Sequence, residues 1–252
     1  MTKCKKEPYN TYSPVGEPVL TMEKNGNCDN CAQCGPTNCF VCCAKCQSKT
    51  WLHIGDVKTE REDKGCGPCK VAHWEFPEGT PGLAENKRPN VFAEATVPIM
   101  GGGCTPTVNV MRRGAAQEME QFAVIEGPTC FGGCMDLCCN TEFKVSRGKG
   151  KAGDLAVISK QKPDGFMELL IAMCTPVDKY QLHFTDNHGL HPTEKAAIMS
   201  EMVHLDFLFF EAEQPLCEYK AEEKMCYILL CTCYCFGCLC PIKMCCGGSS
   251  ED

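Results

Sequence analysis

Several features that would indicate common functions are missing from this sequence. The net charge is −7, so the chain lacks the concentrated positive field that a nucleic-acid ligand requires. No Gly-rich phosphate loop connects a strand to a helix, because the glycines at 101–103 are followed by Cys104, Thr105 and Pro106. The residues also offer no Ser, His and Asp arrangement for nucleophilic catalysis. We therefore expect a protein that is not a conventional enzyme and has no nucleic-acid partner.

A secretory signal is also missing, since the first residues, MTKCKKEPYN, contain neither an apolar run nor a cleavage site. The 25 cysteines are therefore expected to meet a reducing cytosol. Their odd number suggests metal ligands, acylation sites or buried thiols before disulfides. With 252 residues and 44% hydrophobic content, the chain is long enough for one large domain with tails.

Six segments are short, rich in β-branched or alternating residues, and separated by Gly, Pro or Asn. This rhythm predicts a meander of antiparallel strands. In one segment Phe143 and Val145 alternate with polar residues, which places one face of the sheet inside and the other in water. The six predicted strands span residues 18–24, 105–112, 122–126, 141–147, 154–160 and 180–184.

The longest predicted helix spans residues 193–212, and the hydroxyl of Thr193 can cap its first turn. Apolar residues occupy all of its sides, which is typical of a membrane span or of a core helix. Glu201, His204 and Asp206 interrupt it at mid-length, where ionised groups in lipid are expensive. We therefore predict that this helix is buried in protein.

The C-terminal residues 213–252 form a cysteine-rich, apolar tail. Residues 225–242 contain no charge, and this length is near the lower limit for spanning a bilayer. The cysteines suit S-acylation, in which several acyl chains together hold a protein to a membrane. A cysteine-rich strand or turn packed on this protein or on a partner is an equal alternative, and a membrane span is a third. The acylation candidates are Cys226, Cys231, Cys233, Cys235, Cys238, Cys240, Cys245 and Cys246.

Four collinear motifs carry a resemblance to a known family. Residues 122–145, FAVIEGPTCFGGCMDLCCNTEFKV, contain a strand, a Gly-Pro, a cysteine-rich turn and a further strand in order. Residues 205–211, LDFLFFE, are similar to the end of that family's C-terminal helix. Weaker matches lie at 16–38 and 76–82. In order and spacing the chain resembles the phospholipid scramblase family, which is related in fold to the tubby-type and LURP-type barrels.

The resemblance implies an all-β-dominated fold, a closed antiparallel β-barrel around a buried hydrophobic C-terminal helix, over residues 1–212. It also implies phospholipid translocation or membrane remodelling at a cytosolic leaflet, with membrane lipids as partners. We expect a cytoplasmic protein, peripheral on a membrane through its palmitoylated tail. The alternative is a scaffold subunit of a larger assembly, which reuses the barrel for protein partners without scrambling lipid.

The chain departs from the family at two places. The family's acidic calcium segment corresponds to residues 178–191, where only Asp178 and Asp186 supply carboxylates. Calcium takes six to eight oxygen ligands, so we expect weak calcium binding or none. The family's acylation stretch before the proline-rich turn is reduced to Cys66 and Cys69, which suggests that the anchor has moved to the C-terminal cysteines.

Two cysteine motifs lie in the N-terminal third of the chain. CGPCK at 66–70 matches the thioredoxin redox site. A thiol oxidoreductase is therefore a third hypothesis for the function, and it requires a helix to begin at this motif. Cysteines at C-x2-C spacing between 28 and 46 could bind zinc, or else form a thiol-rich hairpin tip. The favoured zinc ligands are Cys31, Cys34, Cys43 and Cys46.

Basic side chains near two of the predicted strands could meet the phosphates of lipid headgroups, as similar patches do in tubby-type barrels. The alternative is that these charges belong to solvated loops. The candidate headgroup contacts are Arg112, Arg113, Arg147, Lys149 and Lys151.

Overall fold

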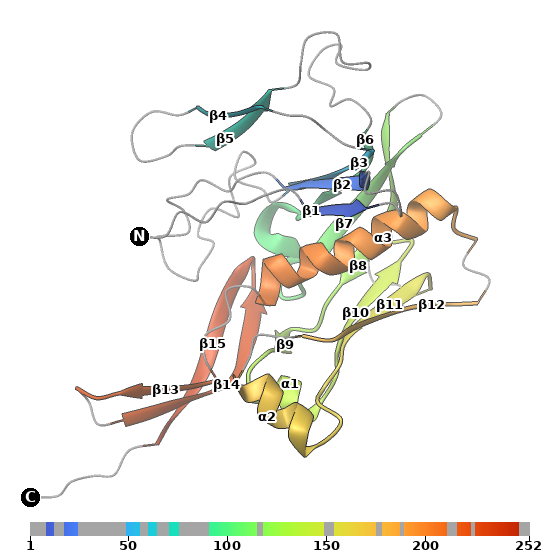
Figure 1. Ribbon diagram of the computed structural model, residues 1–252. Coiled ribbons are helices and arrows are strands. Elements are labelled where there is room, and N and C mark those ends of the chain that lie inside the picture. The colour runs from blue at the N-terminus through green and yellow to red at the C-terminus, as the bar shows by residue number, and fades with distance from the viewer. Residues whose placement is uncertain are drawn as a thin grey trace, which may run out of the picture.

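Most of the chain from residue 91 onward, and a few shorter segments before it, are described by the computed structural model (Figure 1). These residues form one nine-stranded sheet, a smaller sheet built on the C-terminal hairpin, and a separate two-stranded hairpin. The described residues are 9–12, 18–24, 49–55, 60–64, 71–75, 91–114, 118–148, 154–174, 178–186, 189–210, 216–222 and 225–246.

The main sheet is antiparallel throughout and confirms the prediction of an all-β-dominated fold. Its register shifts between Leu52 and His53 and between Val110 and Met111, and such bulges increase the local twist. In sheet order the strands are β1 (Tyr9–Tyr12), β2 (Pro18–Lys24), β3 (Lys49–Ile54), β6 (Val91–Thr96), β7 (Thr107–Arg113), β8 (Met119–Glu126), β10 (Thr141–Ser146), β11 (Ala156–Lys160) and β12 (Tyr180–Phe184).

The prediction of a closed barrel is wrong, because the sheet is a strongly curled half-barrel. Among the described strands, β1 pairs only with β2 and β12 pairs only with β11, so the two edges do not meet. The sheet instead curls around helix α3 (Pro192–Leu205), which contacts β3, β6 and β7 and also the edge strand β12. A helix with its side chains is about 10 Å across, which holds the edge strands apart.

Helix α3 continues as the π-helical turn η5 (Asp206–Phe210), close to the predicted bounds of 193–212. The predicted cap is wrong, because the helix begins at Pro192 and its N-cap is His191, paired with Glu194, while Thr193 lies inside the first turn. Small side chains on the inner face of the sheet, such as Ala93, Ala95 and Ala156, are at most 1% exposed. They share one core cluster with Ile198 of the helix. Small residues let a helix backbone approach a sheet closely, so this face is shaped for α3.

Polar groups along α3 and η5 have partners inside the protein, although Oε1 of Glu201 is buried with no hydrogen bond among the described residues. Nδ1 of His204 lies 2.8 Å from a carboxylate oxygen of Glu201, and both side chains are fully buried. Hydroxyl Oη of Tyr180 donates to Asp206 at 2.7 Å. Because buried polar groups require partners, these contacts explain how one face of α3 is buried despite its charges. The other face is open to solvent, since Met199 is 55% and Val203 39% exposed, so the prediction of a buried helix is confirmed only in part.

Aromatic rings pack around the C-terminal end of the helix, at η5. The rings of Phe143 and Phe209 are stacked with centroids 5.7 Å apart, and Phe131 contacts the edge of Phe210 at 5.4 Å. Phe131 and Phe143 are each 1% exposed. The LDFLFFE segment therefore anchors the helix end in the core of the sheet.

The remaining elements before the tail are short. Strands β4 (Glu60–Lys64) and β5 (Val71–Glu75) form the separate hairpin. The 3-10 turn η4 (Ile99–Gly102) precedes β7, and helix α1 (Cys134–Cys138) lies between the two-residue strand β9 (Cys130–Phe131) and β10. Helix α2 (Phe166–Cys174) connects β11 to β12.

The tail forms strands β13 (Cys217–Lys220), β14 (Met225–Cys235) and β15 (Cys238–Cys246), which we call the C-terminal hairpin. Phe236 and Gly237 make its tight turn, and both have positive φ. Strand β14 pairs with β9, and buried Tyr234 donates its hydroxyl to the carbonyl of Gly101 at 2.8 Å. A Cβ at Gly101 would lie 1.9 Å from that hydroxyl, so glycine is required there.

Candidate functional site

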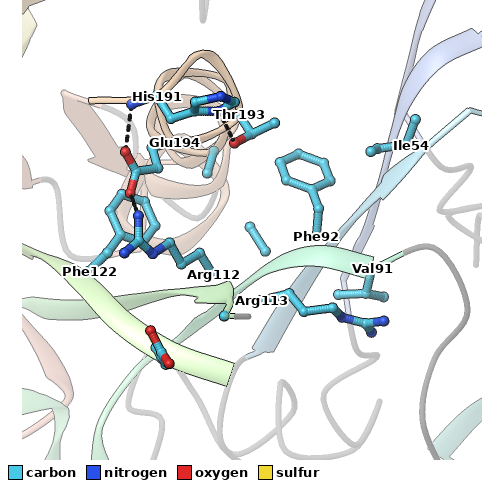
Figure 2. Close-up of a pocket in the computed structure, with 13 residues that line it drawn as sticks. Ile54, Val91, Phe92, Arg112, Arg113, Phe122, His191, Thr193 and Glu194 are labelled. Carbon is cyan, nitrogen blue, oxygen red and sulfur yellow. Dashed lines mark hydrogen bonds and ion pairs between the residues drawn. The ribbon is translucent and has the colours of Figure 1, made fainter. Parts of the chain in front are cut away.

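A cavity of about 610 Å³ lies between the start of α3 and strands β3, β6, β7 and β8 (Figure 2). We call it the arginine pocket, because Arg112 and Arg113 at the end of β7 line it. Its other walls include the apolar side chains of Val91, Phe92 and Phe122. The pocket thus combines two guanidinium groups with apolar and aromatic surface.

The cap of helix α3 is tied to this pocket. Arg112 donates to Oε1 of Glu194, and Oε2 of Glu194 accepts the backbone N–H of His191 at 2.6 Å. Thr193 also lines the pocket, with its hydroxyl 3.0 Å from Nδ1 of His191. Figure 2 shows Arg112, Glu194 and His191 as one connected chain of contacts. The first turn of the helix and the arginine are therefore positioned together.

The charges in the arginine pocket nearly balance. Two carboxylates, Glu120 and Glu194, line it together with the two arginines. Glu120 lies opposite Arg112 in the register of β7 and β8. Because Glu194 is 5% exposed while the Arg112 side chain is 48% exposed, the guanidinium keeps a face toward solvent. The pocket offers a ligand both cationic and anionic groups.

A second group of reactive side chains lies where the C-terminal hairpin meets the body. Three thiol groups have sulfur atoms that all lie within 4.8 Å of one another, close enough to hold a metal ion. The Sγ atoms of Cys130 and Cys233 are 2.7 Å apart, across the β9–β14 pairing. Hydrogen bonding to Cys233, and then burial, raises the pKa of Cys130. We call Cys130, Cys231 and Cys233 the thiol cluster.

Cys231 and Cys233 were predicted as acylation sites, and their grouping with Cys130 was not predicted from the sequence. Cys231 and Cys233 are two apart on a strand, so alternation could have placed them on one face. The pairing of β9 with β14 joins residues 103 positions apart, and no local pattern indicates it.

The other acylation candidates differ in exposure. Cys235, Cys240, Cys245 and Cys246 are exposed, whereas Cys226 and Cys238 are half-buried. Sγ of Cys226 lies 3.0 Å from Sγ of Cys217 on the neighbouring strand. Accessible thiols are therefore present near the end of β15.

The predicted calcium carboxylates do not converge on one site. Asp178 pairs with Nζ of Lys160 at 3.1 Å, and Lys160 also pairs with Asp136 at 3.0 Å. The ammonium group lies 4.0 Å from the centre of the Phe210 ring. The ammonium group of Lys160 thus already pairs with Asp178, where a calcium ion would have to bind. Asp186 is exposed just after the end of β12.

Several predicted residues lie apart from the pocket or outside the described part of the chain. Arg147 is exposed just after β10, and its backbone N–H donates to Asp154 at 2.9 Å. Strand β5 begins at Val71, so the residues that follow the CGPC motif form a strand rather than a helix. The residues outside the description are Lys149, Lys151, Cys31, Cys34, Cys43, Cys46, Cys66 and Cys69.

Comparison with known families agrees with the predicted resemblance. The family model described as Scramblase matches residues 105–212, which run from the start of β7 to just beyond η5. This segment is scramblase-like, and the predicted family is confirmed for it. Scramblases are not a classical enzyme family. Neither the curated proteins nor the solved structures contain a match to the chain.

A membrane span was the third interpretation of the apolar C-terminal tail. Within the described segments, no helix combines the length and the apolar character needed to cross a bilayer. The apolar segment 225–242 lies in strands β14 and β15 and their turn.

Proposed function

We propose that the protein binds phospholipid headgroups at a cytosolic membrane face and acts there in lipid translocation or membrane remodelling. The observation that carries this proposal is the arginine pocket inside the scramblase-like segment. Arg112, Arg113 and the cap of α3 all belong to residues 105–212. Guanidinium groups bind phosphate through paired N–H donors, which makes them suitable for a lipid phosphate.

The balance of charge indicates which headgroups would fit. A phosphate can bind the solvent-facing donors of Arg112, and Arg113 adds positive charge at another wall of the pocket, while a positively charged amine or choline can approach Glu120. Exposed Ile54, at 57%, lines the same pocket and offers apolar contact to the glycerol and acyl region. Zwitterionic headgroups thus match the pocket better than headgroups that carry a second negative charge.

Attachment to the membrane would use the C-terminal hairpin. Cys245 and Cys246 are exposed at the end of β15, where Met244 and Ile242 are each 45% exposed. Acyl chains on these thiols, next to apolar side chains, would hold the protein at a bilayer surface.

The experiment that tests headgroup binding is co-sedimentation with vesicles of phosphatidylcholine and phosphatidylethanolamine. The Arg112→Ala, Arg113→Ala double variant should lose at least about 10-fold in affinity, because the charge-assisted contact of Arg112 and the second positive charge of the pocket are both removed. The exposed Lys162→Ala change should leave binding intact as the control. Equal binding by the double variant and the wild type would refute the pocket as the headgroup site.

Translocation itself needs a separate assay. Wild-type protein reconstituted into vesicles with a fluorescent lipid should expose the inner-leaflet label to an external quencher, and the double variant should not. If neither moves lipid while the wild type still binds, the activity is membrane remodelling or scaffolding and not scrambling.

One observation favours the scaffold alternative. Strand β15 is nine residues long and pairs only with β14 among the described strands, so one edge offers backbone groups to a partner strand. Fractionation of native protein separates the two functions. The lipid anchor is supported if detergent releases the intact protein from membranes, and if hydroxylamine treatment or truncation after residue 224 makes it soluble without detergent. Retention in a detergent-resistant complex of fixed stoichiometry supports the scaffold.

A further inference from the structure

The thiol cluster lies at the pairing of β9 with β14, where the C-terminal hairpin joins the body. Cys130 belongs to β9, and Cys231 and Cys233 belong to β14 of the C-terminal hairpin. Phe131, next to Cys130, is buried in the aromatic cluster, and Tyr234, next to Cys233, is buried beside Phe209. The backbone that carries the thiols is therefore held on both sides by the core.

The number of thiols matters for their chemistry. A disulfide uses two sulfur atoms, and here a third, Cys231, lies within 4.8 Å of both others. Three converging sulfur donors form one face of a tetrahedron or a trigonal set, arrangements that suit soft, thiophilic cations. Calcium and magnesium prefer oxygen donors and would not select this site.

An approach route to the cluster is present. A cavity of about 470 Å³ is lined by Cys130, by the carboxylates Glu126 and Glu142, and by the ammonium group of Lys144. The two carboxylates outnumber the ammonium group, and a lining of net negative charge attracts cations. All three thiols are only partly buried, so solvent and a metal carrier can reach them.

We propose that Cys130, Cys231 and Cys233 bind one thiophilic metal ion, zinc(II) or copper(I), which fastens the C-terminal hairpin to the body. On binding, each thiol releases its proton to solvent and its sulfur forms a bond to the metal, with no change in oxidation state. Zinc would complete four-coordination with water or another ligand, whereas copper(I) is satisfied by three sulfur atoms. The bond would link residues 103 positions apart in the chain.

The test uses the full-length, fully reduced protein under anaerobic conditions, titrated with zinc(II) or copper(I) against a chromophoric chelator. Other cysteines can also bind metal, so the comparison is made in a background in which Cys31, Cys34, Cys43 and Cys46 are Ser. Cys231→Ser should remove one equivalent of tightly bound metal or weaken it by at least about 100-fold. The matched control, Cys245→Ser on the same hairpin, should retain that equivalent.

A second readout guards against a folding defect in the variant. Cobalt(II) should give thiolate charge-transfer absorption in the control and lose it in Cys231→Ser, and metal should raise the midpoint of thermal unfolding in the control alone. The preference between zinc and copper(I) identifies the ion. Equal metal uptake by Cys231→Ser and Cys245→Ser overturns the proposal. So does a Cys130–Cys233 disulfide in native protein whose reduced form takes up no metal at the cluster.

Discussion

The sheet-and-helix body and the C-terminal hairpin are built on different principles. In the body, residues 91–210 bury aliphatic and aromatic side chains from both the sheet and the helix in one core cluster. In the hairpin, Leu229 and Tyr234 are the buried hydrophobic side chains among the described residues. Burial of apolar area is the dominant favourable term in folding, so the body can hold itself together, whereas the hairpin depends on a few anchors.

The cysteines follow the same division. Every described cysteine whose exposure is known is half-buried or exposed, and most of them belong to the hairpin or to the segment around α1. None contributes to the core cluster. The cysteines in the described part of the chain therefore lie at the surface and at the junction of the two regions, which is where acylation or metal binding can act.

The largest expected effect is in the body. Phe143→Ala removes a ring that is 1% exposed and stacked on Phe209, and should lower the free energy of unfolding by about 3–5 kcal/mol. Phe166→Ala, at a ring that is 73% exposed, should change it by less than about 0.5 kcal/mol. Denaturant titration monitored by circular dichroism measures both, and similar losses would mean that Phe143 is not a core residue.

The next effect concerns the buried cation that joins β11 to its surroundings. Lys160→Met should lower the free energy of unfolding by about 3 kcal/mol, because Asp136 would be left without its ion pair at 11% exposure. Adding Asp136→Asn should recover part of this loss, since the amide oxygen can still accept from the backbone N–H of Gly132. If the losses of the two single variants simply add in the double variant, the two residues are not coupled as a pair.

A smaller effect should be confined to the hairpin. Tyr234→Phe removes the donor to the carbonyl of Gly101 and should weaken docking by about 1–3 kcal/mol. Amide exchange should accelerate in β14 but not in β10. Equal acceleration in both strands would contradict the view that the hairpin opens separately from the body.

The same tyrosine predicts a pH dependence. Burial, and to a lesser extent charge on Cys238, raises the pKa of Tyr234 to about 12 from its ordinary value of 10.0. The neutral hydroxyl thus stabilises docking fully below about pH 10, and this contribution is lost as the pH rises toward 12. After correction for intrinsic base-catalysed exchange, the protection of β14 amides should fall over that window in the wild type and change less in Tyr234→Phe.

The smallest effect is at the hairpin surface. Lys243 donates to Glu218 at 2.8 Å, and this hydrogen bond lowers the pKa of Glu218. Lys243→Ala should return the pKa of Glu218 toward its ordinary value, as measured by NMR titration. Any stabilisation from the pair is present above that ordinary value and lost as pH falls, so the wild type and the variant should converge in acid. A change in stability as large as that of Tyr234→Phe would show that the hairpin is held by its surface.

Local patterns predicted several elements well. Strands β2 and β12 match the predicted 18–24 and 180–184, and α3 with η5 follows the predicted helix closely. Strand β6 was not predicted, because two of the three buried residues on its core face are the alanines Ala93 and Ala95, which are depleted in strands. Their small size makes sense only once the helix above them is known.

The candidate sites show the same limit. The sequence indicated Arg112 and Arg113 as headgroup contacts, yet their pocket depends on the cap of α3, some eighty positions away. The partner of Asp178 could not be predicted either, since Lys160 reaches it from a neighbouring strand. Pairing of charges depends on which strands lie side by side, which the local pattern does not specify.

By itself the sequence determined the strand-rich character of the chain, its polar-interrupted helix and its scramblase-like segment, because alternation, the run of helix-forming residues and motif order are local. Only the tertiary structure decided that the sheet stays open around α3, that the apolar tail becomes a hairpin docked through Tyr234, and that Cys130 meets Cys231 and Cys233. The physical reason is that burial and strand pairing join residues far apart in the chain, and their free energy depends on the whole packed core.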